Sequence, residues 1–277
     1  MNKPPRGQRR TGNKGKKRTH NQNRGEKNFG SQRSSKPNRG PNKPGFREDR
    51  LNKRSVDPDL PDDIDPNDLD PTVLQDLKVL SKDNADAVAK HMIMSATLME
   101  EDPQLALRHA RAAKDRAGRV SVAREVNGIA AYHAGEWKEA LSELRASRRM
   151  HGGPGLLAVM ADCERGLGRP EKAIELSRAP EAQQLPADEA IELAIVAAGA
   201  RLDQNQADSA VITLQRASPD KANRGMAAVR LSYAYANALL EAGRRDEAFE
   251  WFQHAATIDE EEWTDAEIRL EELQKNS

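Results

Sequence analysis

The sequence predicts an all-α fold built from stacked helix–turn–helix units. One helical half-motif recurs five times, and each copy is marked by an alanine: Ala106, Ala140, Ala173, Ala210 and Ala248. These alanines lie 33 to 38 residues apart, and self-similarity at about 34 residues is typical of stacked helical hairpins. No segment shows the sustained alternation of apolar and polar residues that indicates a β-strand.

Five helix pairs are expected in order along the chain, followed by one further helix. The pairs are residues 84–99 with 103–115, 118–133 with 136–149, 155–167 with 170–179, 187–202 with 206–217, and 223–242 with 245–257. A helix near 262–275 is expected to cap the stack. Asp102 and Pro103 fit an N-cap followed by proline at the first helical position, which marks one helix start.

Small residues are expected where two helices approach or the chain turns sharply. Alanine fits the closest approach of an antiparallel pair and also has the highest helix propensity. Gly135, Gly168 and Gly243 each lie five residues before a repeat alanine, in the predicted turn between paired helices. Asn205 takes this place in the fourth unit, and asparagine tolerates a left-handed backbone better than most residues.

The formal net charge of zero conceals a division between the two parts of the chain. Residues 1–56 contain 18 Lys and Arg against three acidic residues, whereas residues 57–277 contain 26 against 41. The first part, with a net charge of +15, has too little apolar content to fold and is expected to be a disordered basic arm. Residues 57–71, with seven aspartates and four prolines, are expected to form an acidic linker before a helical domain over 72–277.

Composition also excludes several classes of protein. The single cysteine, Cys163, excludes an internal disulfide and a Cys-based zinc site, and it favours a reducing, cytoplasmic location. The most apolar segment, residues 190–200, is shorter than the roughly 20 residues that span a bilayer. No apolar stretch follows the basic N-terminus, so we expect neither export nor a membrane partner.

No arrangement of residues points to catalysis or to a bound cofactor. The six histidines lack metal-binding spacing, and the acidic linker lacks the turn glycine and twelfth-position glutamate of a calcium loop. No phosphate-binding glycine loop and no catalytic constellation are present. We therefore expect no enzymatic activity, cofactor, metal or small-molecule substrate.

The five recurring segments resemble tetratricopeptide repeats (TPRs). The second and fifth units carry the strongest match, through Gly128, Gly135, Ala140 and Leu144, and through Ala236, Gly243, Ala248, Phe252 and Ala255. The third unit departs from the pattern at Ser177 and Pro180. The resemblance covers roughly residues 84–257. It implies a right-handed α-solenoid of about five hairpins with a C-terminal capping helix and a concave, ligand-facing side.

The same resemblance implies that the first helix of each unit contributes contacts to a partner groove. The residues at these positions are His91, Ser95, Glu125, Ile129, Tyr132, His133, Asp162, Arg165, Arg230, Tyr233 and Asn237, with Leu98, Glu192 and Ile195 at equivalent places. Tyr132 and Tyr233 are candidate hot spots, because tyrosine combines apolar area with a polar tip. The alternative is that both simply pack between helices.

Two functions are compatible with these features, and they can coexist. The first is a non-catalytic scaffold or adaptor that binds a protein segment in the groove. The second is a nucleic-acid- or ribosome-associated factor whose arm binds RNA or DNA non-specifically through its cations. These cations are Arg9, Arg10, Lys14, Lys16, Lys17, Arg18 and Arg24. A solvated arm, or one that contacts the chain's own acidic regions, is the remaining alternative.

Overall fold

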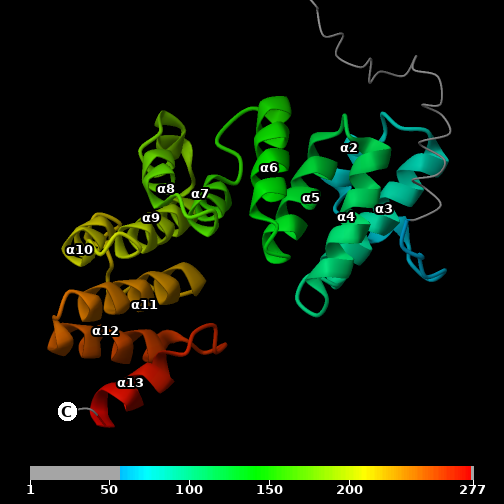
Figure 1. Cartoon of the computed structure of the whole chain (residues 1–277). Helices are drawn as coiled ribbons and strands as arrows, with labels where there is room; N and C mark the ends of the chain where they lie inside the picture. Colours follow the sequence, from blue (N-terminus) through cyan, green and yellow to red (C-terminus); the bar gives the residue numbers. More distant parts are fainter. Residues whose placement is uncertain (1–56, 276–277) are drawn as a thin grey trace, which may run out of the picture. The chain divides into compact units, whose positions relative to one another are not determined.

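The computed structural model describes residues 57–275. All of them belong to one of the two units into which the chain divides, Asp49–Ser277. Within the described residues the fold is entirely helical, without a strand (Figure 1), which confirms the predicted all-α class. The predicted basic arm, residues 1–56, lies outside the described residues, together with its seven candidate cations.

Twelve α-helices are present between residues 57 and 275. They are α2 (Pro71–Leu77), α3 (Lys82–Thr97), α4 (Pro103–Ala117), α5 (Ser121–His133), α6 (Trp137–His151), α7 (Leu157–Gly166), α8 (Pro170–Ser177), α9 (Ala187–Leu202), α10 (Ala207–Gln215), α11 (Met226–Glu241), α12 (Arg245–Ile258) and α13 (Ala266–Lys275). Two short 3₁₀ helices, η1 (Pro66–Asp68) and η2 (Pro180–Gln184), accompany them.

Helices that follow one another in the chain also pack together. Within the five predicted pairs, α3 packs on α4, α5 on α6, α7 on α8, α9 on α10 and α11 on α12. Neighbouring pairs are joined by contacts of α4 with α5, α6 with α7, α8 with α9 and α10 with α11. Figure 1 shows the last pair, α11 and α12, side by side in orange. The pairing order therefore agrees with the order expected from the sequence.

The five repeat alanines are fully buried, and each is 0% exposed. The residues one turn and two turns further along the same face are mostly buried as well, including Leu144 and Phe252. The third unit departs from this pattern, as its sequence does. Ser177 is the last residue of α8, and Pro180 is exposed at the start of η2. Proline cannot continue the helix there, because it lacks the backbone donor that the helix needs.

The turns between paired helices have the backbone conformation that their residues predict. Gly135, Gly168 and Gly243 have φ of +75°, +70° and +75°, and Asn205 has φ of +57°. A left-handed residue at this point satisfies the last carbonyls of the preceding helix. The amide of Glu136, for example, donates to the carbonyl of Ala131 over 2.8 Å. The four turns thus share one geometry, although one of them uses asparagine.

Side-chain capping explains two of the differences between the helices and the predicted ranges. Asp70 Oδ1 accepts from the amide of Thr72 over 2.7 Å, and this cap starts α2, a helix that the pattern did not delimit. Asp259 accepts from the amides of Trp263 and Thr264, each over 2.8 Å. These bonds hold a turn, so α13 starts at Ala266 instead of near residue 262.

The acidic segment at residues 57–71 contacts the first helices. Asp57 forms an ion pair with Arg116 of α4, with 2.6 Å between the carboxylate and guanidinium atoms. Leu69 packs against the buried cluster that contains Leu77 and Val88. No helix in the described part of the chain is both long and apolar enough to cross a membrane.

Candidate functional site

A cavity of about 650 Å³ is bordered by the first helices of four consecutive pairs. Its lining comes from α5, α7, α9 and α11, with one residue of α10 and two from the segment that precedes α13. The lining residues are Tyr132, Asp162, Arg165, Ile195, Val196, Ala198, Gly199, Leu202, Leu214, Met226, Arg230, Tyr233, Ala234, Asn237, Trp263 and Thr264. We call this cavity the α5–α11 groove.

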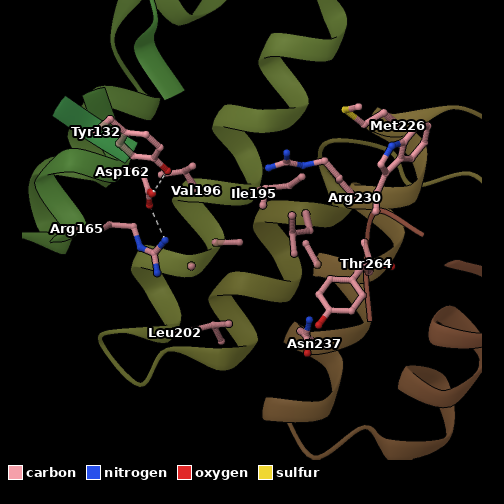
Figure 2. Close-up of a pocket in the computed structure, with 16 residues that line it drawn as sticks. Tyr132, Asp162, Arg165, Ile195, Val196, Leu202, Met226, Arg230, Asn237 and Thr264 are labelled. Atoms are coloured by element: carbon pink, nitrogen blue, oxygen red, sulfur yellow. Dashed lines mark hydrogen bonds and ion pairs between the residues drawn. The ribbon is translucent and has the colours of Figure 1, made fainter. Parts of the chain in front are cut away.

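A hydrogen-bonded network forms one side of the groove (Figure 2). The Tyr132 hydroxyl donates to Asp162 Oδ2 over 2.6 Å, and Arg165 Nη1 donates to Asp162 Oδ1 over 2.8 Å. Arg165 Nε also donates to Asp203 Oδ2 over 2.8 Å. The network links α5, α7 and the end of α9, so it fixes the positions of these side chains relative to one another.

The network also changes the titration of its members. Burial, together with the hydrogen bond to Asp162, raises the pKa of the Tyr132 hydroxyl above its ordinary value. Burial alone would lower the pKa of Arg165, but its bonds with Asp203 and the charge of Asp162 raise it overall. Tyr132 therefore stays protonated and Arg165 stays charged at neutral pH.

Gly199 of α9 leaves the space that the Arg165 guanidinium occupies. A Cβ atom at this position would lie 2.8 Å from Arg165 Cζ and 2.9 Å from its Nη1, closer than carbon and nitrogen atoms can pack. A larger residue would therefore move the guanidinium away from Asp162 and Asp203.

The opposite side of the groove comes from α11 and the segment before α13. Arg230 pairs with Glu192 of α9, with 2.8 Å between Arg230 Nη2 and Glu192 Oε2. Burial raises the pKa of Glu192, although the charge of Arg230 opposes this shift. The Tyr233 hydroxyl donates to Asp265. Figure 2 shows Arg230 and Asn237 on one side of the α9 residues and Asp162 and Arg165 on the other.

Between these polar groups the groove offers an apolar surface. Ile195, Val196 and Leu202 of α9 form its central part (Figure 2). Two large apolar side chains at its edge are unusually exposed: Met226 is 50% exposed and Trp263 is 43% exposed. Exposed large apolar residues beside a cavity are typical of a surface that binds another molecule.

Six of the eleven predicted groove residues line this one cavity: Tyr132, Asp162, Arg165, Arg230, Tyr233 and Asn237. Ile195, predicted at an equivalent place, lines it as well. The structure places the others elsewhere. His91 and Ser95 are buried, at 1% and 0% exposure. His91 faces His109 of α4 instead of a groove.

The remaining predicted residues do not line the groove. Ile129 packs against the buried cluster that includes Leu141 and Leu157. His133 is exposed, and its ring meets the edge of the Tyr132 ring. Glu125 lines a separate, smaller cavity beside Arg148 and His151. Leu98, an equivalent position, ends α3 as its C-cap.

Several residues of the groove were not expected from the repeat positions. Met226, Trp263 and Gly199 line it. Asp203 does not line it but accepts a hydrogen bond from Arg165. A glycine inside the alanine-rich helix α9 is a signal that marks a close approach. Trp263 has no such signal, because its place depends on the turn capped by Asp259.

The described residues include no group of three or more His, Cys, Asp or Glu side chains placed to hold a metal ion. Cys163 is buried, and burial raises the pKa of its thiol to about 12, so it remains a protonated packing residue at neutral pH. The charged groups of the groove largely neutralise one another, which leaves apolar surface and aromatic rings for a ligand.

A comparison with models of known protein families gives no match for this chain. A search of curated proteins also finds no match.

Proposed function

We propose that the chain is a TPR-like α-solenoid that acts as a non-catalytic adaptor and binds a segment of a partner protein in the α5–α11 groove. The observation that carries this proposal is the meeting of six sequence-predicted contact residues in one cavity of about 650 Å³. Sequential helix pairs, buried repeat alanines and left-handed turns support the repeat assignment.

The chemistry of the lining indicates what kind of segment would bind. Arg165 is engaged by Asp162 and Asp203, and Arg230 is engaged by Glu192. A ligand selected by charge would have to break these pairs, whereas apolar side chains can cover Met226 and Trp263 without doing so. A peptide with apolar anchors, whose backbone or polar groups reach Asn237 and the tyrosine hydroxyls, fits this surface best.

The size of the cavity and its extent along the helices also favour a peptide over a small substrate. The cavity lies in the range of ligand pockets, which is about 300–1,000 Å³. Its lining spans four helix pairs, so a ligand that used the whole surface would be elongated. Recognition of a helix or an extended strand by an apolar groove is a recurring mode of peptide binding.

The direct test is selection of peptides from a displayed random library on the full chain, followed by affinity measurements with matched variants. Met226→Glu places a charge on the apolar edge of the groove. Met150→Glu is the control, because Met150 is 45% exposed and lies outside this cavity. We expect Met226→Glu to weaken binding of selected peptides at least about tenfold, since about 1.4 kcal/mol is a factor of ten. Equal affinities of the two variants would contradict the assignment of the groove.

A further inference from the structure

A second cavity, of about 300 Å³, lies between α6 and the start of α8. Its lining consists of Lys138, Leu141, Ser142, Arg145, Arg149, Leu167 and Arg169. Four of these seven residues are cationic and none is acidic, although residues 57–277 as a whole carry a net charge of −15. We call the four cations, Lys138, Arg145, Arg149 and Arg169, the α6–α8 basic pocket.

The cations of α6 are aligned along one face of that helix. Lys138, Ser142, Arg145 and Arg149 are spaced by four, three and four residues, which places them in one row. The row spans roughly 16 Å at 1.5 Å per residue. Arg169, the N-cap residue of α8, adds a further cation beside Arg145.

The acidic residues of α6 are engaged elsewhere. Glu139 accepts from Arg111 Nε over 3.1 Å, and Glu143 accepts from Arg124 Nη1 over 2.6 Å. Both partners belong to the preceding helices α4 and α5. The nearby Glu171 is exposed in the first turn of α8 and does not line the pocket.

One buried carboxylate lies behind the pocket and neutralises only part of its charge. Glu164 of α7 is 1% exposed, and its two oxygens accept from Arg145 over 2.8 Å and from Arg169 over 3.5 Å. Both arginines remain nearly half exposed. Lys138 and Arg149 are exposed and have no ion pair among the described residues. The net charge of the group is therefore +3.

We propose that the α6–α8 basic pocket binds the phosphate backbone of a single-stranded nucleic acid. A phosphorylated side chain presents a single phosphate, whereas this row of cations is about 16 Å long. A stacked strand carries one phosphate about every 3.4 Å, so it can offer a charge to each cation. The +15 charge of residues 1–56 adds attraction for the same polyanion.

The lining also defines the kind of recognition. It contains no aromatic ring for base stacking. Its polar side chains are the four cations and the Ser142 hydroxyl. Contacts to phosphates set affinity and register but do not read sequence. The pocket therefore binds without base specificity, and it does so at a surface separate from the α5–α11 groove, whose lining shares no residue with it.

The test compares two double variants of the full chain that each remove two exposed cations. Lys138→Gln with Arg149→Gln alters the pocket but leaves both arginines that neutralise Glu164. Arg108→Gln with Arg119→Gln is the control, since both residues are exposed and lie outside the pocket. Binding of a labelled oligouridine is measured by fluorescence anisotropy over a salt series, with helicity checked by circular dichroism.

The pocket variant is expected to reduce the slope of log affinity against log salt by about 1.4, which is two phosphate contacts at about 0.7 each for a single strand. The control is expected to keep the slope of the unaltered chain. Ultraviolet cross-links from the oligouridine should also map to α6, and they should decrease in the pocket variant. Met226→Glu should leave this binding unchanged, which separates it from peptide binding in the groove.

Three results would overturn the proposal. The pocket variant and the control could show the same slope, or the cross-links could be confined to residues 1–56. The third is that a phosphoserine peptide binds the pocket while oligouridine does not, which would assign the same cations to a phosphorylated protein.

Discussion

The Nδ1 atoms of His91 on α3 and His109 on α4 lie 3.0 Å apart in the interior of the first helix pair. Both rings are 1% exposed. One Nδ1 donates a proton and the other accepts it, so the hydrogen bond requires that the accepting ring be neutral. Burial, together with the charges of His109 and Arg116, lowers the pKa of His91 to about 4, against an opposing contribution from Asp57. Burial and Arg108 also lower the pKa of His109.

This pair predicts a loss of stability in mild acid. Between about pH 6.5 and pH 4 the unfolded chain binds a proton at His91 that the folded chain does not, so the free energy of unfolding falls as the pH falls. The stability that neutral His91 contributes is fully present above its unfolded pKa of about 6.5, and it has been lost once the pH has fallen through its folded pKa of about 4. Each such histidine gives a slope of up to about 1.4 kcal/mol per pH unit.

Urea unfolding at several pH values measures this slope. His91→Asn keeps a hydrogen-bonding group near the Nδ1 position but cannot take up the proton, so its slope between about pH 6.5 and pH 4 should be smaller. His151→Asn is the control, because His151 is exposed at the end of α6. Slopes that are the same in His91→Asn and in the unaltered chain would contradict the role of the pair.

Most of the helix pairing could be predicted from the sequence because its signals are local. Each repeat alanine marks one contact, and four of the five are preceded at five positions by a residue that forms a left-handed turn. The limits of α2 and α13 could not be predicted in this way. They depend on two aspartate side chains: Asp70 caps the start of α2, and Asp259 holds a turn before α13 through the amides of Trp263 and Thr264.

Residues of the groove could be predicted only on helices where the repeat pattern identifies the face that contacts a partner. Tyr132, Asp162 and Tyr233 lie on the first helices of three pairs, at different positions of the predicted contact face, and all three line one cavity. In the first pair the residue equivalent to Tyr233 is His91, whose ring turns toward α4, where His109 offers a buried hydrogen-bonding partner. Trp263 reaches the groove through a turn outside the repeats, so no periodic signal marks it.

A second prediction concerns the closest approach of α5 and α6. A Cβ atom on Gly128 would lie 2.6 Å from Cγ and Cδ2 of Leu144 and 3.2 Å from its backbone nitrogen. Gly128→Ala is therefore expected to destabilise the fold by about 1–3 kcal/mol through overpacking. The better helix propensity of alanine, about 1 kcal/mol, offsets only part of this cost.

A double-mutant cycle with Leu144→Ala identifies the cause of that loss. The cost of Gly128→Ala should shrink when the Leu144 side chain is absent, because the two groups that collide are then no longer both present. Chemical denaturation of the four proteins gives the coupling free energy. If the two costs simply add, the collision with the Leu144 side chain is not the reason for the effect.

A third prediction uses the left-handed turns. Asn205 has φ of +57° in the turn between α9 and α10. Asn205→Ala should destabilise the chain by roughly 1–2 kcal/mol, because alanine is strained at positive φ whereas asparagine tolerates this conformation. Asn205→Gly should be tolerated, since glycine adopts positive φ without this strain. Thermal unfolding distinguishes the two variants, and equal midpoints would show that backbone strain does not matter at this position.

The final prediction concerns the buried carboxylate of Glu164. It tests the structural role of Arg145 and Arg169 apart from any role in nucleic-acid binding. Arg145→Met together with Arg169→Met leaves this carboxylate without a cation in a site that is 1% exposed. Removing the partners of a buried charge costs about 3–5 kcal/mol, and the partial exposure of both arginines places the expected loss near the lower end. Adding Glu164→Gln to the double variant removes the charge and should restore part of the stability in urea unfolding. A triple variant as unstable as the double variant would mean that lost packing of the arginine side chains, and not the unpaired charge, causes the destabilisation.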